Sequence, residues 1–178
     1  YVGGYQDKLD ALSESLVWEV NRLHSQGAGL EKFGIVEGTY SVAHDDRALG
    51  EDSTGLVYGD KLQSGSSMFY VYNADTGLLV SGASLDWSAA AGVQNFDPTV
   101  NTLEDVADAF NRTFSGAVTA TIVNHKLQLK AADGYQFAFG TDSTGLMAAL
   151  GLNTFFQGST AQDIAVNEKL GTDLYYIC

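Results

Sequence analysis

Residues 118–139 contain three consecutive runs in which every second side chain is apolar, and this pattern constrains the fold more than any other feature of the chain. Alternate side chains of a strand point to opposite faces, so each run predicts a β-strand with one buried face. Short polar segments at 124–126 and 133–134 join the runs, as in antiparallel hairpins. The sequence therefore predicts a three-stranded antiparallel meander. The side chains expected on its buried face are Val118, Ile122, Phe137 and Phe139.

An amphipathic helix is predicted directly before this meander. Thr102 can cap its first turn, and Asp105 stands three residues later, as in a capping box. Gly116 lies where the helical pattern ends. The apolar stripe comprises Leu103, Val106, Ala107, Phe110 and Phe114. We expect Phe110 and Phe114 to pack on the buried face of the sheet.

The remaining patterns place the chain in the α+β class. Met68–Tyr72 and Leu78–Ser81 flank a short loop closed by glycine, which predicts a second hairpin. Leu146–Leu150 is expected to form a short helix capped by Ser143. Residues 31–67 are rich in Gly, Ser and Asp and indicate irregular strand and loop. The predicted fold is antiparallel strands packed with one amphipathic helix, plus an N-terminal helical stem.

Residues 5–24 carry the pattern of that stem. Apolar side chains recur at steps of three and four residues, which forms one stripe of a helix, and Gly27 and Gly29 follow its end. The stripe comprises Leu9, Leu12, Leu16, Val20 and Leu23. Glu19 occupies a position that a two-stranded coiled coil would keep apolar, so a helix lying on a neighbouring element is favoured over a long coiled coil.

Charge and composition exclude several classes of partner. With 22 acidic and 9 basic residues, the 178-residue chain has a net charge of −13 and should repel nucleic acids and anionic lipid surfaces. No apolar stretch approaches the length of a membrane-spanning helix. Cys178 is the single cysteine, so no intrachain disulfide can form. Because the chain starts at Tyr1 without a signal segment, we expect it to be an internal piece of a longer protein.

The residues that could carry chemistry are few and scattered. No two of the histidines, His24, His44 and His125, have metal-ligand spacing, and all three are expected to be exposed. The acidic group Asp45, Asp46, Glu51 and Asp52 could bind calcium, but it lacks the alternating carboxylates of a calcium loop, and a solvated loop is favoured. No nucleophile elbow is present, and Cys178 is a weak nucleophile candidate. We therefore predict no catalytic residue, no metal and no cofactor.

Two further motifs could indicate a function, but each also has a simpler structural explanation. Asn111-Arg112-Thr113 has the form of a glycosylation acceptor but falls inside the predicted second helix, which favours coincidence. Trp18 and Trp87 could stack on sugars, with Trp87 placed near a strand end, but packing is favoured for both.

Two stretches resemble a known family. Residues 12–30 include Glu-Val-Asn-Arg-Leu-His-Ser-Gln-Gly at 19–27, which is similar to a helix end in flagellar hook-associated proteins of the FlgK type. Residues 149–167, which include Leu-Asn-Thr-Phe-Phe-Gln-Gly at 152–158, are similar to a later stretch of the same family. Residues 100–150 also resemble an insertion module shared by flagellins and hook-associated proteins. Nothing in residues 31–100 matches the family.

The resemblance implies a domain organisation and a role. It divides the chain into a helical stem (1–30), an outward-facing α+β domain (31–168) and a C-terminal stub returning to the stem (169–178). It implies a non-enzymatic structural component that joins hook to filament outside the cell and is exported without a cleavable signal peptide. The implied partners are the hook protein, the second junction protein and further copies of the full-length protein, while this piece alone is expected to be monomeric. The expected interface comprises the five stripe residues of the stem and Asn153, Phe155, Phe156 and Ile164.

The alternatives are another axial protein, such as a flagellin, and a surface adhesin or carbohydrate-binding module in which Trp87 would contact the sugar.

Overall fold

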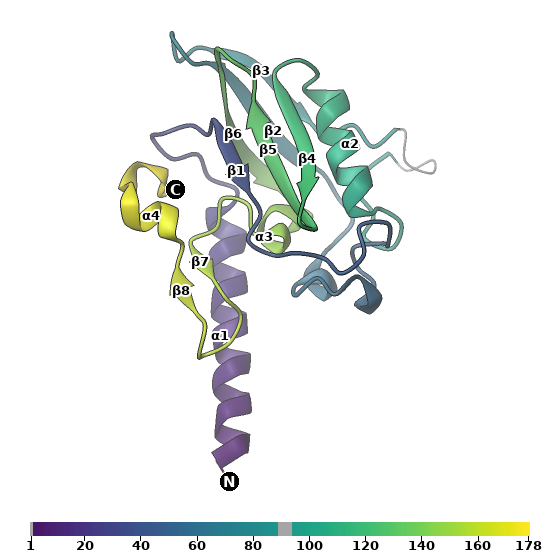
Figure 1. The fold of residues 1–178 in the computed structure, drawn as a ribbon, viewed down its shortest axis with the longest axis vertical. Coiled ribbons are helices and arrows are strands. Elements are labelled where there is room, and N and C mark those ends of the chain that lie inside the picture. Colours follow the sequence, from purple (N-terminus) through teal and green to yellow (C-terminus); the bar gives the residue numbers. More distant parts are fainter. Residues whose placement is uncertain (1, 89–93) are drawn as a thin grey trace.

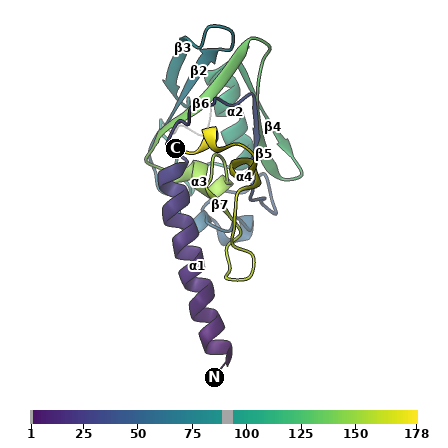
Figure 2. The same ribbon diagram turned by 90° about the vertical axis from the view of Figure 1, so that its left-hand side faces the viewer.

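A 23-residue helix, α1 (Val2–His24), projects from one end of a head built of antiparallel strands and short helices (Figures 1 and 2). The computed structural model describes residues 2–88 and 94–178. The fold is α+β, as the sequence predicted, and α1 confirms the predicted stem helix. Only the C-terminal part of α1 packs on the head, while its N-terminal part extends beyond it (Figure 1).

The first sheet joins strands from distant parts of the chain. It has the order β3-β2-β6 and comprises β2 (Ser67–Asn73), β3 (Leu79–Ser84) and β6 (Tyr135–Asp142), all antiparallel. The predicted hairpin over β2 and β3 is confirmed. On its inner face, Phe69 of β2 lies opposite Phe139 of β6, and both side chains are buried.

The second sheet has the order β1-β5-β4 and is also antiparallel. It comprises β1 (Ile35–Glu37), β4 (Val118–Val123) and β5 (Lys126–Ala131). A two-residue turn links β4 to β5, with φ of 51° at Asn124 and 61° at His125. Two consecutive left-handed residues give the turn the twist that antiparallel strands need, which confirms the predicted hairpin.

The predicted meander is wrong at its third strand. β6 leaves the β4–β5 hairpin and pairs with β2 in the other sheet, while β1 takes the free side of β5. Alternation predicts that a segment is a strand, but it does not specify the neighbouring strand. The pairing of β6 with β2 brings Phe137 and Phe139 onto the aromatic core that contains Phe33 and Phe69.

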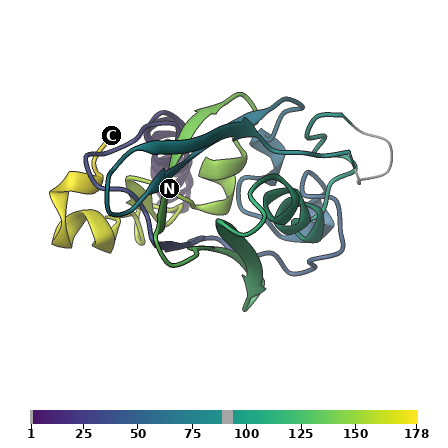
Figure 3. The same ribbon diagram turned by 90° about the horizontal axis from the view of Figure 1, so that it is seen from above.

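Helix α2 (Leu103–Thr113) lies between the two sheets (Figure 3). The ring of Phe110 lies 4.6 Å from that of Phe69, and α2 also contacts β4. Its predicted capping box is confirmed, because Thr102 Oγ1 accepts from the Asp105 N–H and the Asp105 carboxylate accepts from the Thr102 N–H, both at 3.1 Å. The predicted helix–sheet packing is therefore shared between two sheets instead of one.

Helix α3 (Leu146–Leu150) has the predicted bounds but a different cap. The Asp142 carboxylate accepts from the Met147 N–H at 3.0 Å, and Thr144 Oγ1 accepts from the Leu146 N–H at 3.0 Å. Ser143 instead exchanges hydrogen bonds with Ser66. A carboxylate can reach further along the helix start than a serine hydroxyl, so the residue before Ser143 satisfies the first turn.

The rest of the chain is short elements. A hairpin of β7 (Phe156–Gln157) and β8 (Ala165–Val166) runs beside α1 (Figure 1). It is followed by α4 (Glu168–Thr172). Three single turns of 3-10 helix cover Asp52–Thr54, Gly59–Lys61 and Leu174–Tyr176. Of the segment predicted to be irregular strand and loop, residues 31–66 contain one three-residue strand and the first two of these 3-10 turns and otherwise lack regular elements.

Candidate interface at the helical stem

The stem has two separate faces. Val17, Trp18, Asn21 and His24 are buried against the head. The predicted apolar stripe lies mostly on another side of the helix: Leu9, Leu12, Leu16 and Leu23 are 48–67% exposed, and Val20 is half-buried. Successive helical residues turn by about 100°, so the stripe and the buried residues occupy different arcs. Within the described residues, four apolar positions of the stripe are thus left largely uncovered.

Asn21 joins the stem to the β7–β8 hairpin. Its side-chain amide donates to the carbonyl of Phe156 at 2.9 Å and accepts from the N–H of the same residue at 2.8 Å. This pairing resembles one step of a β-ladder, with a helix side chain in place of a strand. A buried amide with both hydrogen-bonding groups satisfied fixes the position of β7 on the stem.

Asn153 closes the C-terminal end of α1. Its side-chain nitrogen lies 3.3, 3.4 and 3.0 Å from the carbonyl oxygens of His24, Ser25 and Gly27. The last carbonyls of a helix have no partner within the helix, so a distant donor can satisfy them. Asn153 adopts a left-handed backbone conformation, with φ of 52°, which asparagine tolerates better than most residues.

His24 is 6% exposed, so the expectation that it is solvated is wrong. Its Nδ1 donates to the Asn153 carbonyl at 2.9 Å, and its Nε2 accepts from the Cys178 N–H at 3.2 Å. These partners require the neutral tautomer that carries its proton on Nδ1. Burial lowers the pKa of His24, and the hydrogen bond to the Asn153 carbonyl opposes that shift in part. The end of a helix was expected to be solvated, but two distant segments cover it.

This geometry predicts a pH dependence of stability. Above pH 6.5 the imidazole is neutral in the folded and the unfolded chain. Below that pH the unfolded chain binds a proton that the folded chain resists, so the free energy of unfolding falls as the pH decreases from 6.5 towards the lowered pKa. Chemical unfolding between about pH 7.5 and 5.5 measures the effect. His24→Gln should flatten this dependence, and His44→Gln, at an exposed position, should retain it. Equal pH profiles for the two variants would contradict the assignment.

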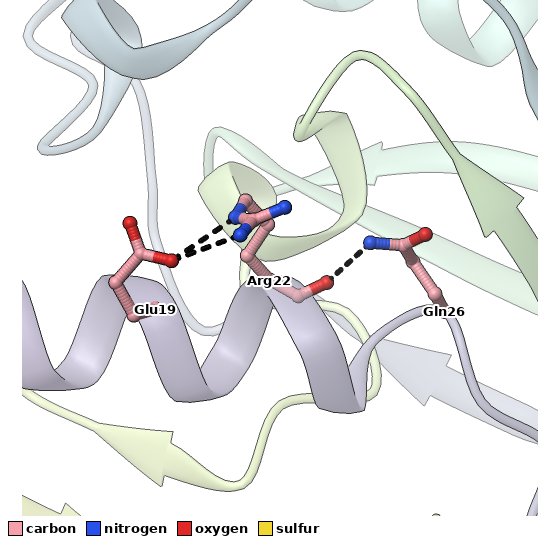
Figure 4. Close-up of polar contacts among 3 residues, drawn as sticks. All are labelled: Glu19, Arg22 and Gln26. Atoms are coloured by element: carbon pink, nitrogen blue, oxygen red, sulfur yellow. Dashed lines mark hydrogen bonds and ion pairs between the residues drawn. The ribbon is translucent and has the colours of Figure 1, made fainter.

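Gln26 ties the end of the stem to β6, because its Oε1 accepts from the Asp142 N–H at 3.2 Å. Its Nε2 donates to the Arg22 carbonyl at 2.7 Å (Figure 4). Arg22 donates in turn to the Glu19 carboxylate at 3.0 and 3.3 Å. These residues line a polar cavity of about 510 Å³, whose second cation, Lys61, is paired with Asp60 at 2.7 Å. Both cations of the cavity are thus neutralised by neighbouring carboxylates.

The C-terminal residues also lie against the end of the stem. A Cβ at Gly27 would overlap Cys178, and the Glu31 N–H donates to the Tyr175 carbonyl at 3.1 Å. Lys169 Nζ lies 4.4 Å from the centre of the Phe33 ring and 4.3 Å from that of Tyr176, and donates to the Ile35 carbonyl at 3.3 Å.

Burial lowers the pKa of Lys169 and raises that of the Cys178 thiol. A thiol held in its protonated form is a poor nucleophile.

The two stretches that carry the family resemblance therefore meet at one junction. Asn21, His24 and Gln26 come from the first, and Asn153 and Phe156 come from the second. Phe155, Phe156 and Ile164 are half-buried, and Phe156 and Ile164 pack against the hydrophobic core of the same chain. Of the expected interface, the segment around Asn153 is thus engaged within the chain, whereas Leu9, Leu12, Leu16 and Leu23 are exposed. A role of either set in binding another protein stays a prediction.

The other candidate residues do not converge. His125 and His44 are exposed, and the ring of His125 pairs with the Asp45 carboxylate at 3.1 Å. Glu51 accepts from Ser53 Oγ, at a distance of 3.0 Å, and Asp52 starts a 3-10 turn. In the part of the chain that the structure describes, no three His, Cys, Asp or Glu side chains form a group that could hold a metal ion.

The two tryptophans and the Asn111 motif make contacts within the fold. Trp18 and Trp87 are 8% and 1% exposed, so neither presents a ring face to a sugar, as the packing interpretation predicted. The Asn111 side chain donates to the Ala120 carbonyl at 3.0 Å and accepts from the Ala120 N–H at 2.8 Å. Its amide nitrogen is therefore occupied by a contact with β4, and the motif lies inside α2.

No protein-family model and no curated protein sequence matches the chain. None of the helices in residues 2–88 and 94–178 combines the length and apolar character needed to cross a bilayer.

Proposed function

We propose that the chain is a non-enzymatic structural segment of a bacterial flagellar axial protein of the hook-associated type, acting as a mechanical adaptor between hook and filament. One observation carries the proposal: the two stretches that resemble the family, residues 12–30 and 149–167, interlock through buried hydrogen bonds at the base of a helix that presents an apolar stripe. An adaptor needs a rigid connection and an assembly surface, and the junction and the stripe supply them.

The junction suits the transmission of force. Asn21, His24 and Asn153 contribute hydrogen bonds that cross between the stem and the second stretch, and all three side chains are buried. These buried hydrogen bonds resist shear, because breaking them leaves unpaired polar groups. A load on the stem would thus reach the head through fixed geometry rather than through a flexible linker.

The composition is compatible with export and assembly outside the cell. A chain exported in an unfolded state must fold on the far side, and one proline and one cysteine minimise slow isomerisation and disulfide exchange. The net charge of −13 favours solubility before assembly. The expected partners of the stripe are the hook protein, the second junction protein and copies of the full-length protein.

The proposal is tested by Leu12→Glu combined with Leu16→Glu, introduced into the full-length protein in its own bacterium. Both side chains are largely exposed, so the free energy of unfolding of the chain should change by no more than about 0.5 kcal/mol. Two charges in the apolar stripe should block its burial against a partner. We expect cells that retain hooks and lose attached filaments, scored by electron microscopy and swimming assays.

The matched control is Leu30→Glu combined with Leu174→Glu, which adds the same charges at leucines that are 81% and 71% exposed and lie outside α1. These cells should swim as the parent does. Normal filaments on cells with the stripe variant would refute the assembly role of the stripe. Immunogold labelling along the filament would refute the role at the junction, and labelling away from the flagellum would refute the flagellar proposal itself.

A further inference from the structure

A cavity of about 330 Å³ lies between β1 and α4. Its volume falls in the range of about 300–1,000 Å³ that is usual for pockets that hold small ligands. Phe33, Leu170 and Tyr176 contribute apolar walls, and Lys169 and Glu37 contribute charged groups. This combination is typical of a ligand site, in which the apolar walls supply burial and a few polar groups set the orientation of the ligand.

The backbone of β1 is unpaired where it borders this cavity. The Gly38 N–H donates to the Leu127 carbonyl of β5 at 2.8 Å, and antiparallel strands exchange hydrogen bonds at every second residue. Ile35 and Glu37 therefore direct their backbone groups away from β5. Within residues 2–88 and 94–178, no backbone hydrogen bond joins either residue to an element other than β5. This short stretch can accept one further strand.

Lys169 stands at one end of the unpaired stretch. Its ammonium donates to the Ile35 carbonyl at 3.3 Å and lies over the rings of Phe33 and Tyr176. In the part of the chain that the structure describes, it forms no ion pair with a carboxylate. Burial lowers the pKa of Lys169, although the nearby Asp173 carboxylate opposes this shift in part. An ammonium has three N–H donors, so two of them remain for a ligand.

The charges at the cavity match a single carboxylate. Lys169 is the one cation among the described residues that line it, so a singly charged anion suits the cavity better than a phosphate. The lining carboxylate of Glu37 is already held by Gln128 Nε2 at 3.1 Å. The net charge of −13 is spread over the whole surface, and salt screens it within about 8 Å, so contact with the ammonium decides binding.

We propose that this cavity binds the C-terminal end of an extended peptide, which pairs with β1 through its backbone and with Lys169 through its terminal carboxylate. The geometry sets the direction of the peptide. Its second-last residue pairs with the backbone of Glu37, and the peptide runs antiparallel to β1. Strand residues advance by about 3.3 Å each, so the terminal carboxylate reaches the level of the Ile35 carbonyl, where the ammonium lies. This site does not depend on the proposed role in the flagellum.

The proposal is tested by titrating the purified, isotope-labelled chain with acetyl-alanyl-leucine and following its amide resonances by NMR. We expect the Glu37 amide to shift, with a dissociation constant of about 1 mM or lower, as a ligand of this size allows. The C-terminal amide of the same peptide keeps the backbone but lacks the charge, so it should bind at least about tenfold more weakly. 4-Methylpentanoate keeps the carboxylate and the apolar chain but lacks the peptide groups, and it should also bind at least about tenfold more weakly.

Two variants test the lysine directly. Lys169→Met keeps an aliphatic chain over the two rings and removes the charge, so it should weaken binding of acetyl-alanyl-leucine at least about tenfold. Lys130→Met, at an exposed position of β5 outside the cavity, should leave the dissociation constant unchanged. Circular dichroism checks that both variants are folded, and the comparison of ligands needs neither variant.

Three results would overturn the proposal. The first is the absence of any shift with acetyl-alanyl-leucine at up to about 10 mM. The second is equal binding of the peptide acid and its amide, because the terminal carboxylate would then contribute nothing. The third is equal binding of the peptide and 4-methylpentanoate, because the occupant would then be a small carboxylic acid that does not pair with β1.

Discussion

Replacing Asn153 by alanine should lower the free energy of unfolding by about 2–4 kcal/mol. The side chain is buried, and its nitrogen is the donor to three carbonyls at the end of α1. Alanine removes the side-chain donor from the Ser25 and Gly27 carbonyls, whereas the His24 carbonyl still accepts from the Gly27 N–H at 3.0 Å. Alanine also has to adopt a φ of 52°. Urea unfolding followed by circular dichroism measures the loss.

The chain offers a matched control for the backbone term. Asn124 has a φ of 51°, but it lies exposed in the turn between β4 and β5. Asn124→Ala therefore carries the same conformational cost without the lost donor, and it should destabilise by about 1–2 kcal/mol or less. Asn153→Gly removes the conformational cost and should still destabilise more than Asn124→Ala. Equal losses at positions 153 and 124 would show that the carbonyl contacts contribute nothing.

Elements specified by local patterns were predictable. The helical period gave α1, and the Thr102–Asp105 pair marked the start of α2 because a capping box is formed within four residues. The β4–β5 hairpin followed from alternation on both sides of a short polar turn. In each case the interacting groups are close in sequence, so the pattern contains the contact.

Features that depend on distant contacts were not predictable. The partner of β6 is decided by aromatic packing with Phe69, which lies about seventy residues earlier in the chain. The cap of α3 comes from Asp142 because β6 ends there. Alternation does not specify which strand a segment pairs with, and a capping preference does not specify which distant residue reaches the start of a helix.

At the candidate interface, too, distant contacts decided which residues are buried. The most apolar arc of α1 was expected to be its contact face, and the arc that packs on the head instead includes Asn21 and His24. These polar residues are buried because the second stretch supplies matched backbone groups. The sequence signal for the buried face was the pair Val17-Trp18. These two apolar residues lie outside the leucine stripe, on the arc of α1 that packs on the head.

The largest single loss of stability is expected from Phe69→Ala, at about 3–5 kcal/mol. The side chain is buried, and its ring lies 4.6 Å from Phe110, 6.3 Å from Phe114 and 5.5 Å from Phe139. It therefore packs the first sheet on α2 and adds a side-chain contact to the backbone ladder that joins β2 to β6. Its removal leaves a cavity between three elements that cannot close without moving a sheet or a helix.

Phe155→Ala is the corresponding control outside the head. Phe155 is half-buried beside the stem, with its ring 4.9 Å from Phe156 and 5.6 Å from His24, so its truncation should cost less than half as much. Calorimetric melting of both variants gives the comparison. A loss at Phe155 as large as that at Phe69 would mean that the junction, and not the aromatic core of the head, dominates the stability of the chain. Because Leu12 and Leu16 are exposed on the stem and Phe69 is buried in the head, its effect should be the same in the Leu12→Glu, Leu16→Glu background.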